Sequence, residues 1–153
     1  MSKQRPKILA ISSGGGHWVQ LLRLRPAFEG GDVLFATTRP GYESDLDQGE
    51  RFTVIPDATR WSKIGLVKSA LSILLLLLRE RPDVVITTGA APGYFAIRMA
   101  RIIGSKTVWV DSVANVEELS MSGRKAGPHV DLWLTQWSHL AVESGPQFHG
   151  SVV

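Results

Sequence analysis

The stretch Lys7-Ile8-Leu9-Ala10-Ile11-Ser12-Ser13-Gly14-Gly15-Gly16-His17 joins a short apolar run, Lys7–Ser13, to three consecutive glycines, after which a helical pattern covers His17–Phe28. This order is typical of the buried strand, tight turn and helix of a βα unit. The alternation continues and predicts further strands at Asp32–Thr38, Arg51–Asp57, Asp83–Gly89, Lys106–Ser112 and Leu132–Gln136, with a last short strand within Phe148–Val153. Further helices are predicted at Ser62–Arg81, Pro92–Ile103, Glu117–Arg124 and Ser138–Gly145. We therefore expect one Rossmann-like α/β domain over residues 1–153, with a parallel sheet flanked by helices.

The composition is that of a packed domain, with 153 residues, 44% of them hydrophobic and 20% charged. The chain is short for a complete nucleotide-sugar enzyme built from two such domains. If it belongs to such an enzyme, we expect a second chain to supply the other domain. The absence of cysteine excludes disulfides, thiolate zinc sites and cysteine nucleophiles. The N-terminus lacks the apolar stretch and cleavage site of a signal peptide, which argues against secretion.

The formal net charge of +3 is compatible with three anionic partners: nucleic acid, a phosphorylated ligand and an acidic lipid surface. The basic residues are dispersed, and no nucleic-acid-reading motif is present. We therefore expect no nucleic-acid partner.

Each predicted strand runs out into a segment rich in Gly, Pro, Asp, Thr or His. In a parallel sheet these ends share one edge, and open α/β folds bind their ligands there. We expect the functional site at this edge.

The segment Ser13-Gly14-Gly15-Gly16 is a candidate phosphate-binding loop. Its glycines let a ligand approach the backbone, and the following helix directs N–H groups and the positive end of its dipole toward an anion. A tight turn without a ligand is the alternative. A Walker loop is excluded because Gly-Lys-Ser/Thr is absent, and a dinucleotide fingerprint fits poorly because Val19 stands where its third glycine belongs.

His17 is a candidate general base. At a helix start the dipole favours a neutral imidazole, which can accept a proton from a sugar hydroxyl. A hydrogen-bonded loop histidine without a catalytic role is an equal alternative.

Two later strand ends supply further candidates. Thr88, Gly89 and Gly93 form a second small-residue loop that could face the same ligand, or serve as a plain strand-to-helix connection. Asp111 ends a strand and could orient or deprotonate a hydroxyl, with Asn115 beside it, or could instead cap the next helix. The acids and histidines show no metal-ligand spacing, so we predict no metal and no other cofactor.

The stretch Leu66–Leu78 is the most apolar part of the chain. A helix of this length reaches about 20 Å, too short for a hydrocarbon core of about 30 Å. Its residues from Ile73 to Leu78 are apolar all round, whereas packing on a sheet needs only one stripe. We expect the helix both to pack on the sheet and to contact a membrane surface, with Lys63, Lys68, Arg79 and Arg81 near lipid phosphates. Packing on the sheet alone is the alternative.

Three groups of motifs together resemble a known family. They are Ser12–Trp18, Arg81–Gly89 and the series Asp111–Asn115, Leu119–Arg124 and Thr135–Trp137. The chain resembles the bacterial PssD-type polysaccharide-biosynthesis subunits, relatives of the membrane-anchoring subunit of the eukaryotic dolichol-linked chitobiose-forming transferase. More distantly, it is similar to the N-terminal domain of the murein N-acetylglucosaminyltransferase.

The resemblance implies the N-terminal, acceptor-binding half of a GT-B glycosyltransferase, whose donor-binding catalytic half is a second polypeptide. It places the glycine loop and His17 at the acceptor diphosphate and hydroxyl, with Thr88 and Gly89 nearby. Asp111 stands where family members commonly have Glu, and the N-terminal transmembrane helix of the eukaryotic relatives is absent, so membrane contact should be peripheral.

The resulting hypothesis is transfer of a sugar from a UDP-sugar to an undecaprenyl-diphosphate-linked saccharide, at the cytoplasmic face of the inner membrane, in exopolysaccharide or capsule biosynthesis. His17, or less favourably Asp111, would take the hydroxyl proton. The alternative is a membrane anchor that recruits the catalytic subunit and carries no catalytic residue.

Overall fold

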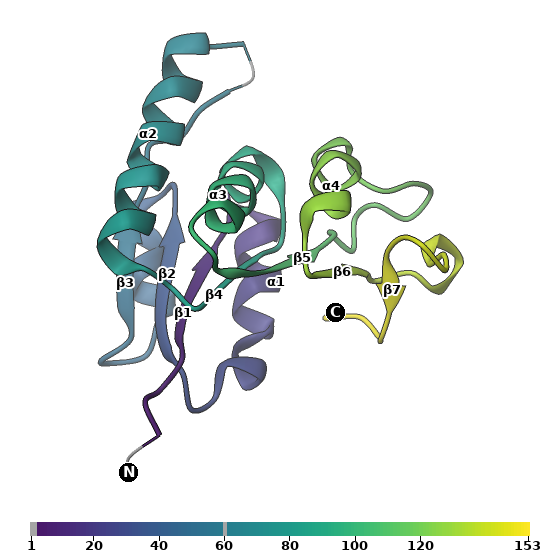
Figure 1. Ribbon diagram of the computed structural model, residues 1–153, viewed down its shortest axis with the longest axis horizontal. Helices are drawn as coiled ribbons and strands as arrows, with labels where there is room; N and C mark the ends of the chain where they lie inside the picture. Colours follow the sequence, from purple (N-terminus) through teal and green to yellow (C-terminus); the bar gives the residue numbers. More distant parts are fainter. Residues whose placement is uncertain (1–2, 60) are drawn as a thin grey trace.

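A seven-stranded parallel sheet forms the centre of the computed structural model, which describes residues 3–59 and 61–153 (Figure 1). Its strands are β1 (Lys7–Ile11), β2 (Asp32–Thr37), β3 (Arg51–Val54), β4 (Val84–Thr87), β5 (Lys106–Val110), β6 (Leu132–Thr135) and β7 (Gln147–Phe148). They lie in the order β3-β2-β1-β4-β5-β6-β7, and every neighbouring pair is parallel. The Rossmann-like parallel sheet expected from the sequence is confirmed.

Helices cover both faces of the sheet (Figure 1). They are α1 (Gly16–Arg23), α2 (Lys63–Glu80), α3 (Ala90–Ile102) and α4 (Met121–Ala126), with 3₁₀ turns η1 (Arg25–Phe28), η2 (Pro40–Asp45), η3 (Gly127–His129) and η4 (Ser138–Leu140). Alternate residues of β1 point to opposite faces, so Leu9 and Ile11 join the core beneath α2, α3 and α4, whereas Ala10 packs with Trp18 and Leu21 of α1. Burial on both faces explains why the strands read as continuous apolar runs.

Three helix predictions differ from the structure. The helix predicted over His17–Phe28 ends at Arg23 and continues as η1, because Pro26 has no backbone N–H to donate. The helix predicted at Glu117–Arg124 begins only at Met121, after Ser120 accepts a capping bond from the Gly123 N–H at 2.9 Å.

The helix predicted at Ser138–Gly145 is wrong beyond its first turn, η4. The following residues form an irregular loop that returns the chain to the sheet as β7. The final strand, predicted within Phe148–Val153, lies earlier and covers only Gln147–Phe148.

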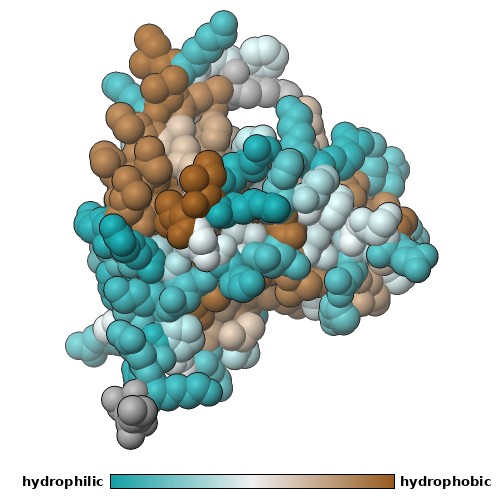
Figure 2. Space-filling model, viewed as in Figure 1, coloured by the Kyte–Doolittle hydropathy of each residue, from teal (hydrophilic) through white to brown (hydrophobic). Residues whose placement is uncertain are grey.

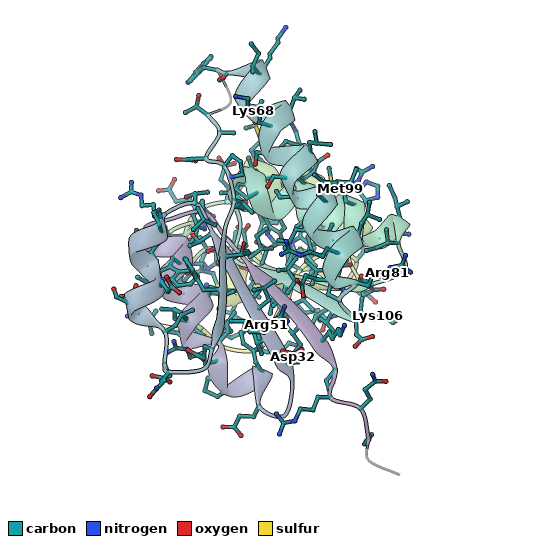
Figure 3. All side chains as sticks on the ribbon, turned by 90° about the vertical axis from the view of Figure 1, so that its left-hand side faces the viewer. Asp32, Arg51, Lys68, Arg81, Met99 and Lys106 are labelled. Carbon is teal, nitrogen blue, oxygen red and sulfur yellow. The ribbon has the colours of Figure 1, made fainter. Side chains whose placement is uncertain are left out.

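The long helix α2 runs from the carboxyl edge of the sheet back to its amino edge, and its first turns project beyond the strands (Figures 1 and 3). Its start is capped by Ser62, whose hydroxyl accepts the Gly65 N–H at 3.0 Å. Near its other end, Glu80 accepts a hydrogen bond from Arg51 at 2.6 Å, which lowers the pKa of Glu80 and raises that of Arg51. Across residues 3–59 and 61–153, no helix is both long and apolar enough to cross a bilayer.

Candidate functional site

The glycine turn after β1 lies at the point where the sheet changes direction. Strand β1 has β2 on one side and β4 on the other, and the chain crosses over β1 between β3 and β4. At such a switch point the connections leave in opposite directions and open a crevice at the carboxyl edge. The loops that follow β1, β2 and β4 therefore meet at one place.

Gly15 gives the turn its shape. Its φ of 72° and ψ of −139° lie outside the regions open to other residues, and an added Cβ would meet nothing within 4 Å. The requirement for glycine therefore comes from the backbone and not from crowding. The turn leads directly into α1, whose first N–H groups, those of Gly16 and His17, have no acceptor within the helix.

His17 is fixed in one orientation by the loop after β4. Its Nδ1 lies 2.9 Å from the Thr88 carbonyl oxygen, and the Thr88 hydroxyl donates to the His17 carbonyl at 2.6 Å. A carbonyl oxygen can only accept, so Nδ1 carries a proton and donates it, and in the neutral ring the lone pair is then on Nε2. The half-buried imidazole therefore has the geometry of a general base.

Gly89 makes room for this ring. A Cβ at Gly89 would lie 3.1 Å from Cε1 and 3.2 Å from Nδ1 of His17, and the φ of Gly89 is 125°. Both the backbone conformation and the close approach therefore demand glycine. Of the predicted site residues, the structure brings together Gly14, Gly15, Gly16, His17, Thr88 and Gly89.

Asp111 and Asn115 belong to a separate cluster at the end of β5. The Asp111 carboxylate is 2% exposed and accepts four hydrogen bonds, from Trp109 Nε1, Asn115 Nδ2 and the Ser120 N–H and hydroxyl, at 2.6 to 3.1 Å. It thereby shapes the loop that ends in the cap of α4. These bonds occupy the carboxylate as a structural acceptor, so its predicted catalytic role gains no support and stays a prediction.

The two remaining predicted residues, Gly93 and Ser13, make contacts that are explained by packing and local hydrogen bonding. Gly93 is buried in α3, where a Cβ would lie 2.1 Å from Oγ1 of Thr87, so its glycine is explained by close packing of the helix on β4. The carbonyl of Ser13 accepts the hydroxyl of Ser12 at 2.9 Å.

A buried pair of glutamines ties α1 to the far half of the sheet. Gln20 Oε1 accepts from Gln136 Nε2 at 2.6 Å and from the Val113 N–H at 2.9 Å. Gln136 Oε1 in turn accepts the Val152 N–H at 2.8 Å. Helix α1, the loop after β5 and the C-terminal segment are thus joined by one chain of hydrogen bonds, which sequence analysis did not identify.

Two residues on the turn after β2 also border the glycine turn, and neither was predicted as a site residue. The Tyr42 hydroxyl accepts the Gly15 N–H at 2.9 Å, and a Cβ at Gly14 would lie 3.3 Å from Nε of Arg39. The sequence signal was the position of Arg39 directly after a strand end. The glycine turn is therefore flanked by the β2 turn on one side and by His17 and the β4 loop on the other.

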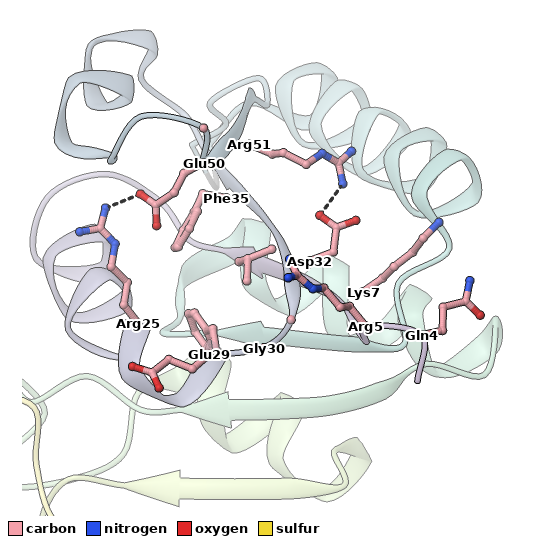
Figure 4. A pocket seen from close by; sticks show the side chains of 14 residues that line it. Gln4, Arg5, Lys7, Arg25, Glu29, Gly30, Asp32, Phe35, Glu50 and Arg51 are labelled. Atoms are coloured by element: carbon pink, nitrogen blue, oxygen red, sulfur yellow. Dashed lines mark hydrogen bonds and ion pairs between the residues drawn. The ribbon is translucent and has the colours of Figure 1, made fainter. Parts of the chain in front are cut away.

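A cavity of about 640 Å³ lies at the opposite, amino edge of the sheet (Figure 4). Its walls carry the ion pairs Arg25–Glu50 at 2.8 Å and Arg51–Asp32 at 3.5 Å. Within the part of the chain that the structure describes, no cluster of three or more His, Asp or Glu side chains could hold a metal ion.

Comparison with known proteins gives a family and a fold. The family model "Oligosaccharide biosynthesis protein Alg14 like" matches residues 43–152. The UDP-N-acetylglucosamine transferase subunit ALG14 of Yarrowia lipolytica is 27% identical, over 97% of this chain and 82% of the relative. The subunit of the same name from Schizosaccharomyces pombe is 26% identical, over 93% of this chain and 82% of the relative.

Among solved structures, Acinetobacter baumannii MurG superposes with a TM-score of 0.75 at 14% identity, over 97% of this chain. Staphylococcus aureus MnaA in complex with UDP gives a TM-score of 0.63 at 16% identity, over 86% of this chain. The chain spans 46% of MurG and 38% of MnaA. The fold is that of the N-terminal domain of GT-B glycosyltransferases such as MurG.

Proposed function

The chain belongs to the Alg14-like family of oligosaccharide biosynthesis proteins, and from this premise we propose that it is one subunit of a two-component UDP-N-acetylglucosamine transferase. The relatives bear the name of subunits of that transferase, which supports a partner chain. In this division the present chain holds the acceptor and the partner binds the UDP-sugar.

The geometry of His17 is the observation on which the catalytic part of the proposal rests. With Nδ1 held by the Thr88 carbonyl, Nε2 accepts the proton of the acceptor hydroxyl as that oxygen attacks the anomeric carbon of the UDP-sugar, whose bond to UDP breaks so that UDP leaves. The N–H groups at the start of α1 hold the acceptor diphosphate. Positioning of the two substrates across the cleft between the chains supplies much of the remaining rate enhancement. Asp111 contributes by shaping the loop that carries Asn115.

We propose an undecaprenyl-diphosphate-linked saccharide as the acceptor, at the cytoplasmic face of the inner membrane. This assignment follows the resemblance to the PssD-type subunits and places the reaction in exopolysaccharide or capsule biosynthesis. The non-catalytic anchor that recruits the transferase remains the competing function, and substitution of His17 separates the two.

The test of the two-component proposal is reconstitution. The purified chain, the product of its neighbouring gene, and the two together are assayed with UDP-N-acetylglucosamine and a short-chain polyprenyl-diphosphate-linked sugar. We expect transfer only from the mixture, with each chain alone giving less than about a tenth of its rate. Full transfer by this chain alone would contradict the proposal.

Membrane contact is proposed for the outer face of α2. Its exposed apolar residues recur every three or four positions and so form one stripe, which we call the α2 stripe: Ile64, Val67, Leu71, Leu75 and Leu78. The inward face, with Ile73 and Leu77, is fully buried in the core. Figure 2 shows the apolar surface gathered over this helix.

The surroundings of the stripe favour a lipid surface. Lys63 and Lys68 lie on the projecting half of α2, and Arg79 and Arg81 lie at its other end, where they can meet lipid phosphates (Figure 3). The projecting half rises from the carboxyl edge, which also carries the glycine turn. A bilayer against the stripe would therefore lie beside the site that receives the lipid-linked acceptor.

The double substitution of Leu71 and Leu75 by serine tests the contact. Both side chains are more than half exposed, so the fold should be retained while apolar area available to the bilayer is lost. We expect binding to vesicles containing phosphatidylglycerol to fall about tenfold or more in a co-sedimentation assay. Val142→Ser, at an equally exposed position in the loop before β7, is the matched control and should bind as wild type. Unchanged binding of the double variant would remove the stripe from the proposal.

A further inference from the structure

The turn after β2 is held firmly against the start of α1. The Tyr42 ring stacks on the buried Trp18 ring, with centroids 5.5 Å apart and planes 14° from parallel. Asp45, at the end of the same turn, accepts a hydrogen bond from Trp18 Nε1 at 2.9 Å. Trp18 is the third residue of α1, so the turn keeps a fixed place beside the glycine turn.

From this position Tyr42 occupies a donor of the glycine turn. Its hydroxyl oxygen accepts the Gly15 N–H, at the distance at which an oxygen of a bound anion would accept it. The neutral hydroxyl oxygen of Tyr42 therefore occupies a position that suits the charged oxygen of an anion. An incoming phosphate oxygen would have to displace the hydroxyl or share the N–H with it.

Arg39 adds a positive charge on the same side. Its Nε lies 3.3 Å from the position of a Cβ at Gly14, which places the guanidinium group against the glycine turn. Among residues 3–59 and 61–153, no carboxylate lies within ion-pair distance of Arg39. The exposed guanidinium is thus left with its charge uncompensated beside an anion-binding turn.

We propose that Arg39 and Tyr42 form the second wall of the diphosphate site. Arg39 binds the diphosphate through paired N–H donors, and Tyr42 holds the Gly15 N–H in the absence of ligand and releases it when the diphosphate enters. This inference rests on the proposed function, because it assigns further binding residues to the same acceptor. It predicts opposite effects for the two side chains.

Calorimetric titration of the full chain with geranyl diphosphate tests the assignment. Arg39→Gln should weaken binding about tenfold, because a charge-assisted pair is lost, and Arg39→Lys should recover part of the loss. Tyr42→Phe should strengthen binding about two- to fivefold, because it keeps the stacking on Trp18 and frees the Gly15 N–H. Arg101→Gln, at an exposed arginine on α3, is the matched control and should bind as wild type.

The results of this titration distinguish a failure of the Arg39 and Tyr42 assignment from a failure of the proposed diphosphate site. Wild-type protein that does not bind geranyl diphosphate would contradict the diphosphate site itself. Wild-type binding that persists unchanged in Arg39→Gln, or that weakens in Tyr42→Phe, would overturn the inference and leave the proposed function standing. Circular dichroism of each variant confirms that its fold is retained.

Discussion

Replacement of His17 by alanine is expected to lower kcat of the reconstituted transferase by about 10²- to 10⁴-fold, the range typical for loss of a general base. The structure supplies the reason. The Thr88 carbonyl fixes the proton on Nδ1 and leaves the Nε2 lone pair, and alanine removes the acceptor altogether. Steady-state kinetics with saturating UDP-sugar would measure the effect.

Two further variants make this result specific. His17→Asn can still donate to the Thr88 carbonyl through its amide but offers no comparable base, so it should be nearly as inactive as alanine. His129→Ala, which alters a histidine of η3 just before β6 and so at the amino edge, should retain full activity. If His17→Ala turns over at the wild-type rate while the complex stays intact, the chain is a scaffold and the catalytic proposal fails.

Gly89→Ala is expected to lower kcat/KM by about 10- to 100-fold and to destabilise the fold by about 1–3 kcal/mol, the range for a residue forced into a sparsely populated conformation. An alanine cannot adopt the φ of 125° without strain, and its Cβ would stand 3.1 Å from the His17 ring. The ring must then shift and lose its alignment with the acceptor. Chemical denaturation and the imidazole NMR signals of His17 would report the two effects separately.

Gly41→Ala, in η2, provides the matched comparison. Its backbone has no positive φ, and a Cβ there would meet nothing within 4 Å. Activity should therefore stay within a few-fold of wild type. Equal losses in the two variants would show that the glycines matter for general crowding and not for the placement of His17.

The parts of the site that sequence alone predicted are those with local signals. Three glycines before a helix predict a turn that presents backbone N–H groups. A parallel sheet then places the loop after β4 beside this turn, so Gly15, His17 and Thr88 were all predicted to lie at one site. The strands were found because burial on both faces makes them continuously apolar. Their ends were set one to three residues too late in several cases, since the loop residues that follow are also small or β-branched.

The parts that sequence did not predict depend on contacts between distant segments. Gln20 and Gln136 are 116 residues apart, and nothing near either residue marks them as a buried pair. Tyr42 reaches Gly15 across 27 residues through a 3₁₀ turn that has no helical or strand periodicity. The loop after η4 was mistaken for a helix because local pattern does not reveal its tight turn, in which the Val142 N–H donates to the Pro146 carbonyl and the Gly145 N–H donates to the Val142 carbonyl.

The hydrogen bond between the Gln136 side chain and Val152 links the C-terminal segment to the candidate site. A binding partner that pulled this segment away would remove one donor from a buried amide oxygen, and Gln136 also bonds to Gln20 on the helix that carries His17. A contact made by the C-terminal segment is therefore connected, through Gln136, to Gln20, which lies one helical turn from His17. By linkage, a partner that loosened this segment and thereby weakened acceptor binding would itself bind less tightly when the acceptor site is filled.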